Sequence, residues 1–246
     1  MLMDGKELAR DIKAKIKAEI DDIKRIYNVN PTVASILVGE DPASQVYLNS
    51  QIKSYQDLGI GVQKYFFSKE ISEAYLLNLI DKLNKDTEVD GIMINLPLPP
   101  QISATKVLNR IKLIKDVDGF KAENLGLLFQ NNEDFISPST PAGIMALIEG
   151  YKIDLQGKDV VVVGRSNIVG KPVAALVLNS HGTVTICNSH TKNLAAKTKD
   201  ADILISAVGK PKFITEDMVK EGAVVIDVGI NRVNGKLEGD VDFENV

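Results

Sequence analysis

An uninterrupted run of valines leads directly into a turn that begins and ends with glycine. Residues 160–163 are all valine, and Gly164 and Gly170 bound the turn that follows. A short apolar strand that enters such a turn and then a helix is typical of a parallel α/β sheet. At this junction free backbone N–H groups and the positive end of the helix dipole face a ligand's phosphates. The segment therefore predicts a dinucleotide site that includes Gly164, Arg165 and Ser166.

The next predicted strand bears on which dinucleotide is bound. The spacing of Gly164 and Gly170 departs from the G-x-G-x-x-G fingerprint of dinucleotide-binding sites. Glycines also occur in such turns where a strand simply packs against a helix and binds no ligand. The strand at 183–187 ends in Asn-Ser-His-Thr, where an NAD site usually carries an acidic residue for the ribose 2′-hydroxyl. Arg165 can instead pair with a 2′-phosphate, to which Ser189 and Thr191 can hydrogen-bond. This favours NADP over NAD, the alternative being that Arg165 is a solvated turn residue.

Composition excludes several classes of protein. A chain of 246 residues can bury one large core or two modest ones, and its net charge of −4 offers no basic stripe for nucleic acid. The single cysteine, Cys187, cannot form an internal disulfide. No apolar signal segment and no run of about 20 apolar residues is present, so we expect a cytoplasmic protein without a membrane partner. His181 and His190 lack metal-ligand spacing, and we expect no metal.

Apolar strands alternate with amphipathic helices in two blocks. The first block is expected to hold helices at 8–27, 44–58 and 71–83 and strands at 32–38, 62–67 and 91–94. The second is expected to hold a helix at 141–151, strands at 158–163, 183–187, 202–206 and 223–228, and a hairpin turn at Asn234-Gly235. The sequence therefore predicts a two-domain α/β protein: an N-terminal α/β domain at 1–120, a doubly wound Rossmann-like domain at 121–246, and a cleft between them.

Two polar side chains in the first block could contact a flat heterocycle. Tyr47 and Gln51 share one face of a predicted helix, and a tyrosine at a cleft can stack on a ring. The pattern alone favours the alternative, in which Tyr47 packs in the core with Leu48 and Ile52. Asp118 lies in an acidic turn, where a carboxylate can cap local backbone or pair with an amino-pyrimidine edge.

Six short motifs span nearly the whole chain. They are VGEDPASQVY at 38–47, LPLP at 96–99, KDVDGF at 115–120, STPAG at 139–143, GRSNIVGKP at 164–172 and DVGINR at 227–232. In this order they resemble the bifunctional methylenetetrahydrofolate dehydrogenase/cyclohydrolases. The resemblance implies an N-terminal folate-binding domain, a C-terminal NADP-binding domain, a homodimer, and one-carbon derivatives of tetrahydrofolate as substrates.

The resemblance also assigns roles to individual residues. The position that matches Tyr47 contacts the pterin, and the position that matches Asp118 anchors its amino-pyrimidine. Leu96 and Pro97 match positions that contact substrate. The family positions that line the dinucleotide match Gly164, Arg165, Ser166, Ser189 and Ile230. Thr191 joins this list as a candidate because its hydroxyl can hydrogen-bond to a 2′-phosphate.

This chain departs from the family at several positions. Gln51 replaces the catalytic lysine, and Asn95 replaces the glutamine before Leu-Pro-Leu-Pro. Lys53 cannot substitute for that lysine, because it lies roughly 120° around the helix from the Tyr47 position. Lys121 replaces a histidine and brings another cation near the expected cleft. The sequence stops after 239–243, where the family continues through a loop that walls the folate site.

These departures separate the two expected reactions. Hydride transfer needs mainly alignment of cofactor and substrate, whereas opening of the methenyl ring by water needs proton transfers that Gln51 cannot perform. We therefore expect a dehydrogenase whose cyclohydrolase activity is weakened. The alternatives are a monofunctional dehydrogenase and a regulator that binds folate or dinucleotide without turnover.

Replacement of Arg165 by alanine tests the cofactor preference. We expect Arg165→Ala to weaken NADP⁺ binding far more than NAD⁺ binding, because only NADP⁺ presents a phosphate to the guanidinium. Dissociation constants for both nucleotides, measured by titration, check this. Equal losses for the two nucleotides would contradict the assignment.

Overall fold

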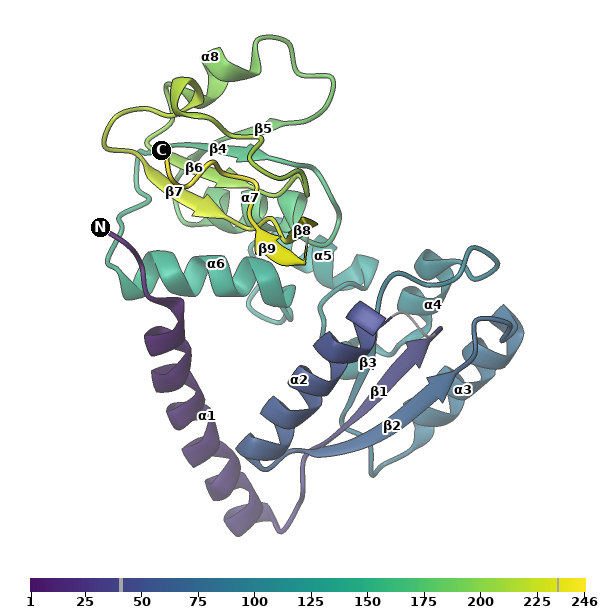
Figure 1. Cartoon of the computed structure of the whole chain (residues 1–246). Helices are drawn as coiled ribbons and strands as arrows, with labels where there is room; N and C mark the ends of the chain where they lie inside the picture. Colours follow the sequence, from purple (N-terminus) through teal and green to yellow (C-terminus); the bar gives the residue numbers. More distant parts are fainter. Residues whose placement is uncertain (40–41, 234) are drawn as a thin grey trace. The chain divides into compact units, whose positions relative to one another are not determined.

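The chain forms two compact units, each built on a parallel sheet (Figure 1). The computed structural model describes residues 1–39, 42–233 and 235–246, and the side chains of helix Pro42–Leu58 from Gln45 onward. Contacts divide the chain into Met1–Asn124 and Leu125–Val246. The predicted α/β class is confirmed.

The first unit contains a three-stranded sheet in the order β2-β1-β3. Its strands are β1 (Thr32–Val38), β2 (Gly61–Phe67) and β3 (Gly91–Ile94). Its helices are α1 (Gly5–Tyr27), α2 (Pro42–Leu58), α3 (Glu73–Lys85), α4 (Ala104–Arg110) and the 3-10 turn η1 (Leu113–Lys115), and α5 (Ala122–Phe129) follows. Every predicted strand and helix of the first block is present, with ends that differ by a few residues.

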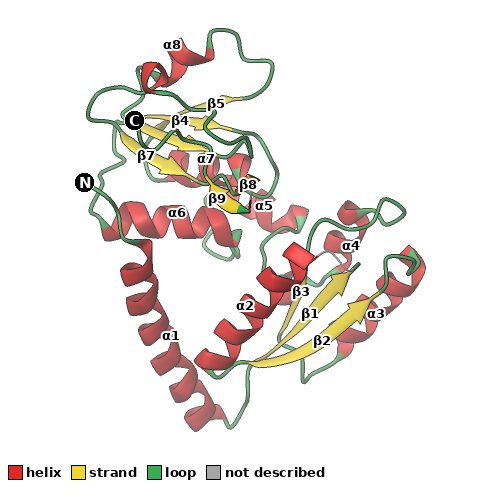
Figure 2. Ribbon diagram, viewed as in Figure 1, coloured by secondary structure: helices red, strands yellow, loops and turns green. Residues whose placement is uncertain are grey.

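Helices cover both faces of this sheet (Figure 2). Leu48 and Ile52 of α2 pack on one face, and Leu76 and Ile80 of α3 pack on the other. Because both faces are covered, β1 is buried from Val33 to its end, and its apolar residues do not alternate with exposed polar ones.

The long helix α1 is attached through polar contacts. Asp4 caps it by accepting from the N–H groups of Lys6 and Glu7. Along its length Lys13 Nζ donates to Ser54 Oγ, and Lys17 Nζ donates to a backbone carbonyl near the end of α2. Of its predicted apolar stripe only Ile20 is buried.

The second unit contains a four-stranded sheet in the order β5-β4-β6-β7. Its elements are α6 (Ser139–Gly150), β4 (Asp159–Val163), α7 (Gly170–Asn179), β5 (Thr183–Cys187), α8 (Leu194–Thr198), β6 (Ile203–Ser206), η2 (Glu216–Met218), β7 (Val224–Asp227), β8 (Asn231–Val233) and β9 (Lys236–Glu238). The antiparallel pair β8-β9 stands where the hairpin was predicted, although Asn234 lies outside the described residues. The strand order reverses direction between β4 and β6, which is where ligands bind in sheets of this kind.

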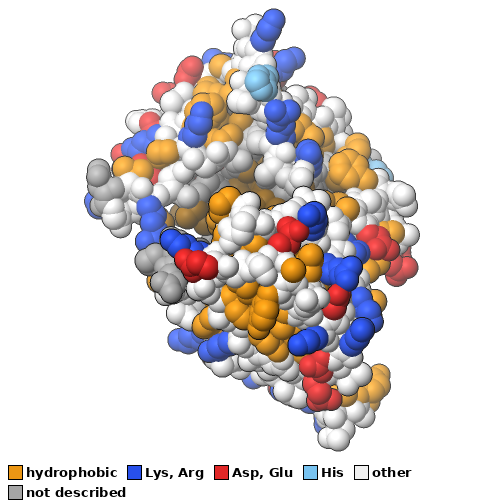
Figure 3. Space-filling model, turned by 90° about the vertical axis from the view of Figure 1, so that its right-hand side faces the viewer, with side chains coloured by type: hydrophobic (Ala, Val, Ile, Leu, Met, Phe, Trp, Pro, Cys, Tyr) orange, Lys and Arg blue, Asp and Glu red, His pale blue; other side chains and the backbone are white. Residues whose placement is uncertain are grey.

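The surface carries charges of both signs. Basic and acidic side chains are interspersed over the face shown in Figure 3. In the described part of the chain, no helix is long and apolar enough to cross a membrane.

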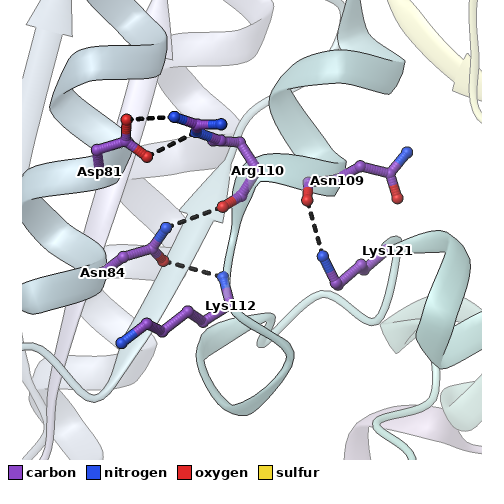
Figure 4. A network of polar contacts seen from close by, with 6 residues as sticks. All are labelled: Asp81, Asn84, Asn109, Arg110, Lys112 and Lys121. Carbon is purple, nitrogen blue, oxygen red and sulfur yellow. Dashed lines mark hydrogen bonds and ion pairs between the residues drawn. The ribbon is translucent and has the colours of Figure 1, made fainter.

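A buried asparagine joins the ends of α3 and α4 (Figure 4). Asn84 Nδ2 donates to the Arg110 carbonyl at 2.8 Å, and its Oδ1 accepts from Lys112 N at 2.9 Å. Beside it, the Arg110 guanidinium makes two contacts of 2.6 Å with the Asp81 carboxylate. The Asn84 amide therefore helps to fix the backbone that leads from α4 toward Asp118, together with the buried Lys115 amine, which donates to the Leu83 and Asp86 carbonyls.

Replacement of this amide should cost more stability than loss of the neighbouring ion pair. Asn84→Ala leaves a carbonyl and an N–H unpaired, so we expect a loss of about 1–3 kcal/mol in the free energy of unfolding. Arg110→Ala, the control, removes an exposed pair and should cost less. Urea denaturation measures both losses, and an equal or larger loss in Arg110→Ala would contradict the ranking.

Candidate active site

The chain turns sharply where β3 ends. Asn95 is buried, and both its backbone N–H and its Nδ2 donate to the Ile36 carbonyl, at 2.9 and 3.1 Å. The Leu96–Pro97 peptide bond that follows is cis. The three residues that the sequence assigned to substrate or catalysis thus stand together at the carboxyl end of β3.

Asp118 is held at the same end of the sheet. Asp116 bridges to Ile92 along β3, and the backbone N–H of Ile94 donates to the Asp118 carboxylate. Burial raises the pKa of Asp118 from 3.8 to about 7, and the charge of Asp116 adds to the shift. The carboxyl can therefore exist in either protonation state near neutral pH.

Asp116 is more deeply buried than Asp118. Its Oδ2 accepts from Lys121 N at 2.8 Å and from Asn124 Nδ2 at 2.7 Å. The Lys121 amine donates to the Asn109 carbonyl at 2.7 Å (Figure 4). Lys121 is thus bound to the end of α4 through one of the three donors of its amine.

One face of α2 carries a row of polar side chains. Tyr47, Gln51 and Tyr55 follow one another at single-turn spacing. Tyr47 is 60% exposed while Leu48 and Ile52 are 1% and 3% exposed, so the interpretation of Tyr47 as a core residue is wrong. The side chain is available to a ligand.

Tyr55, the last residue of the row on α2, lies within electrostatic reach of Asp118. Burial raises the pKa of Tyr55, and the charges of Asp118 and Tyr47 raise it further. The Tyr55 hydroxyl hydrogen-bonds to Met93 Sδ at 3.7 Å. Between the tyrosines, Gln51 Oε1 is buried and has no hydrogen-bond partner among the described residues.

The sequence analysis missed Tyr55 and Asp116. The four-residue spacing that links Tyr47 to Gln51 continues to Tyr55 and could have indicated it. Asp116 gave no such signal, because two carboxylates in one acidic turn do not reveal which is buried.

The glycines after β4 allow very close backbone packing. Gly164 has φ +130°, and a Cβ on it would lie 2.3 Å from the Ala207 carbonyl oxygen. A Cβ on Gly170 would lie 2.3 Å from the Gly164 carbonyl oxygen. Only glycine fits at either position, so the turn lies directly against α7 and the end of β6.

The turn presents hydrogen-bond donors. Ser166 Oγ accepts from the N–H groups of Val169 and Gly170 at 3.1 and 3.3 Å, so this side chain caps α7. Arg165 is exposed, and in the described part of the chain its backbone N–H and that of Asn167 have no partner. This donor set fits an anionic dinucleotide.

The remaining predicted cofactor residues differ in availability. The Thr191 hydroxyl accepts a hydrogen bond from Asn188 N at 2.8 Å and also hydrogen-bonds to the buried Cys187 thiol. Thr191 therefore holds the turn after β5 in place. Ser189 and Ile230 are exposed. No group of three or more metal-binding side chains occurs among the residues described.

Two family models match the two halves of the chain. The catalytic domain of the tetrahydrofolate dehydrogenase/cyclohydrolase family matches residues 3–118, and its NAD(P)-binding domain matches residues 138–246. The chain belongs to this family. The resemblance inferred from the sequence motifs is therefore confirmed.

Relatives in this family are similar along the whole chain. The Bifunctional protein FolD of Fusobacterium nucleatum is 89% identical over 246 residues, which are 100% of this chain and 87% of that protein. A crystal structure of the bifunctional FolD enzyme from Campylobacter jejuni is 44% identical and has a TM-score of 0.98, covering 100% of this chain and 87% of that one. The Trypanosoma brucei FolD, solved with NADP cofactor and inhibitor, is 31% identical with a TM-score of 0.94 over 99% of this chain and 86% of that one.

The raised pKa of Asp118 makes stability depend on pH. The folded protein holds this proton up to about pH 7, whereas the unfolded chain releases it near 3.8, so wild-type stability falls as pH rises between these values. Asp118→Asn removes this titration. We expect the variant's free energy of unfolding, relative to wild type, to increase from about pH 5 to about pH 8.

Urea denaturation at both pH values measures the change. Asp57→Asn, which removes an exposed carboxylate from the same unit, controls for a general charge effect. A difference between Asp118→Asn and wild type that stays constant with pH would show that Asp118 ionises normally in the folded protein.

Proposed function

We propose that this protein oxidises 5,10-methylenetetrahydrofolate to the 5,10-methenyl form with NADP⁺ and hydrolyses the product to 10-formyltetrahydrofolate. The observation that carries the proposal is the Asp118 carboxyl, held at the end of β3 within electrostatic reach of Tyr55, which shares one face of α2 with Tyr47. Membership of the tetrahydrofolate dehydrogenase/cyclohydrolase family and a close relative called Bifunctional protein FolD support it.

The end of β3 binds the folate. Asp118 accepts hydrogen bonds from the amino-pyrimidine edge of the pterin, a pairing that burial strengthens. Tyr47 stacks its exposed ring on the pterin and orients the one-carbon bridge. Leu96 and Pro97 supply apolar contacts, and Asn95 fixes the turn that carries them.

The turn after β4 binds NADP. The backbone N–H groups of Arg165 and Asn167, in the turn before α7, receive the phosphates, with Gly164 permitting close approach and Ser166 holding the turn. Arg165 pairs with the 2′-phosphate of NADP. Residues 188–191 include no acidic side chain that would repel this phosphate. Ser189 and Ile230 complete the lining of the NADP site, and Thr191 holds the turn after β5 that carries Ser189. Bound NADP⁺ accepts the hydride from the one-carbon bridge.

Gln51 limits the hydrolytic step. Water must add to the methenyl carbon, one carbon–nitrogen bond of the ring must open, and a proton must leave. The unpartnered Gln51 Oε1 can accept a hydrogen bond from that water and orient it, but an amide cannot take its proton. General acid–base help is worth about 10²- to 10⁴-fold, so dehydrogenation proceeds faster than hydrolysis.

A monofunctional dehydrogenase is the second candidate, and Gln51 is the observation that favours it. A paired assay of NADP⁺ reduction and methenyltetrahydrofolate hydrolysis on one preparation decides between them. Both activities support the bifunctional proposal, and reduction alone supports the second candidate. Binding of both ligands without NADP⁺ reduction would contradict both and indicate a regulator.

The same proposal includes assembly and location. The protein acts in the cytoplasm as a homodimer formed through the second unit. Among the residues that the structure describes, strand β5 pairs with β4 alone and leaves one edge free, and Ile186 of β5 and Leu178 of α7 are exposed apolar side chains. A free edge flanked by apolar side chains favours association with a second copy.

Restoring a lysine should act on one reaction selectively. We expect Gln51→Lys to raise methenyl hydrolysis about tenfold or more while changing NADP⁺ reduction by less, because an amine can exchange a proton and an amide cannot. Rates of both reactions at saturating substrate measure the effect.

Gln56→Lys provides the matched control. It makes the same substitution at an exposed position of α2, away from the row of Tyr47, Gln51 and Tyr55. Wild-type hydrolysis as fast as NADP⁺ reduction, or an equal gain in both lysine variants, would show that Gln51 is not the limiting group.

A further inference from the structure

A fully buried carboxylate follows strand β9. Asp240 is 0% exposed, and its two oxygens accept five hydrogen bonds. Oδ2 accepts from Val208 N at 2.7 Å, Gly209 N at 3.2 Å and Ser206 Oγ at 3.3 Å. Oδ1 accepts from Lys210 N at 2.8 Å and Asn231 Nδ2 at 3.1 Å. Three consecutive backbone N–H groups thus converge on one carboxylate.

These donors keep the carboxylate ionised. Burial alone would raise the pKa of Asp240, but the hydrogen bonds from the backbone and from Asn231 outweigh it and lower the pKa. A buried charge is costly unless it is fully paired, so the loop at 207–210 and Asp240 stabilise each other.

Asp240 is itself held in place. Asp227, at the end of β7, accepts from Asp240 N at 2.9 Å and Val241 N at 3.0 Å. A Cβ on Gly229 would lie 2.1 Å from Asp240 Oδ1, so the chain after β7 also closes tightly on the carboxylate. Little freedom remains at this position.

The loop that Asp240 holds lies beside the dinucleotide-binding turn. Residues 207–210 directly follow β6, the neighbour of β4 at the point where the strand order reverses. The Ala207 carbonyl oxygen lies against Gly164, where it excludes any side chain. The loop and the turn therefore border the same crevice outside the carboxyl ends of β4 and β6.

We infer that Asp240 is a positioning residue for the dinucleotide: its carboxylate fixes the 207–210 loop against Gly164, so that this second wall of the cofactor site is formed before the cofactor binds. The inference rests on the proposed NADP-dependent function. A preformed wall spares the cofactor the entropy cost of ordering the loop, so its loss weakens binding of the dinucleotide and leaves the folate end of β3 unaffected.

The test is Asp240→Asn in the full chain. The amide keeps the shape of the side chain but places an NH₂ group against the donors of one oxygen, so at least two hydrogen bonds are lost. We expect the Kd for NADPH, measured by its fluorescence, to rise about tenfold or more. The KM for NADP⁺ should rise with it, while the Kd for tetrahydrofolate should stay within about twofold. A merely structural role would change both ligands together.

Asp242→Asn is the matched control, because this carboxylate pairs with Lys212 and Asn245. It should bind both ligands as wild type does. If Asp240→Asn does not fold, Asn231→Ala and Ser206→Ala each remove one donor and should each weaken NADPH about two- to fivefold.

The outcomes separate the inference from the proposed function. The inference would be overturned, and the proposed function left standing, if folded Asp240→Asn bound NADPH with wild-type affinity. Wild-type NADPH affinity in both Asn231→Ala and Ser206→Ala, or an equal loss of affinity for NADPH and tetrahydrofolate in Asp240→Asn, would have the same meaning. Wild-type protein that binds no NADPH would contradict the proposed function, and the inference with it.

Discussion

Burial of parallel sheets on both faces is the constraint on which the rest of this structure depends. In the first unit α2 and α3 cover opposite faces, and β1 and β3 are then buried along nearly their whole length. All carboxyl ends of a parallel sheet point the same way, so polar side chains just after the strands gather at one edge. Asn95 and Asp118 meet at the end of β3 for this reason, and Gly164 and the 207–210 loop meet at the ends of β4 and β6.

Two buried carboxylates show how the surroundings decide the chemistry of one residue type. Asp118 receives one backbone N–H beside a second carboxylate, and its pKa rises to about 7. Asp240 receives five donors, and its pKa falls. The first carboxyl can change its protonation state during a reaction, whereas the second remains a fixed negative charge that organises backbone.

The sequence predicted the elements well because buried strands and amphipathic helices leave periodic patterns. It also selected Asp118, Gly164 and Arg165 as candidate site residues from local motifs, and their roles stay predictions. It could not place Tyr47, because the exposure of a helical tyrosine depends on which face meets the sheet, and that is a tertiary property. The role of Asp240 and the hydrogen bonds of Lys121 were missed for a similar reason, since each depends on backbone groups that are distant in sequence. The hydrogen bonds of Thr191 were missed because they depend on the local shape of a turn.

The tyrosine row on α2 has a spectroscopic consequence. The chain contains six tyrosines and no tryptophan, so its intrinsic emission is that of tyrosine alone. Tyr47 and Tyr55, two of these six, share one face of α2, and Tyr55 lies within electrostatic reach of Asp118. Tyrosine and reduced nicotinamide emit in well-separated spectral regions. Binding of the folate proposed to stack on Tyr47 can therefore be followed by tyrosine emission, and binding of reduced nicotinamide by its own emission, without attaching a label.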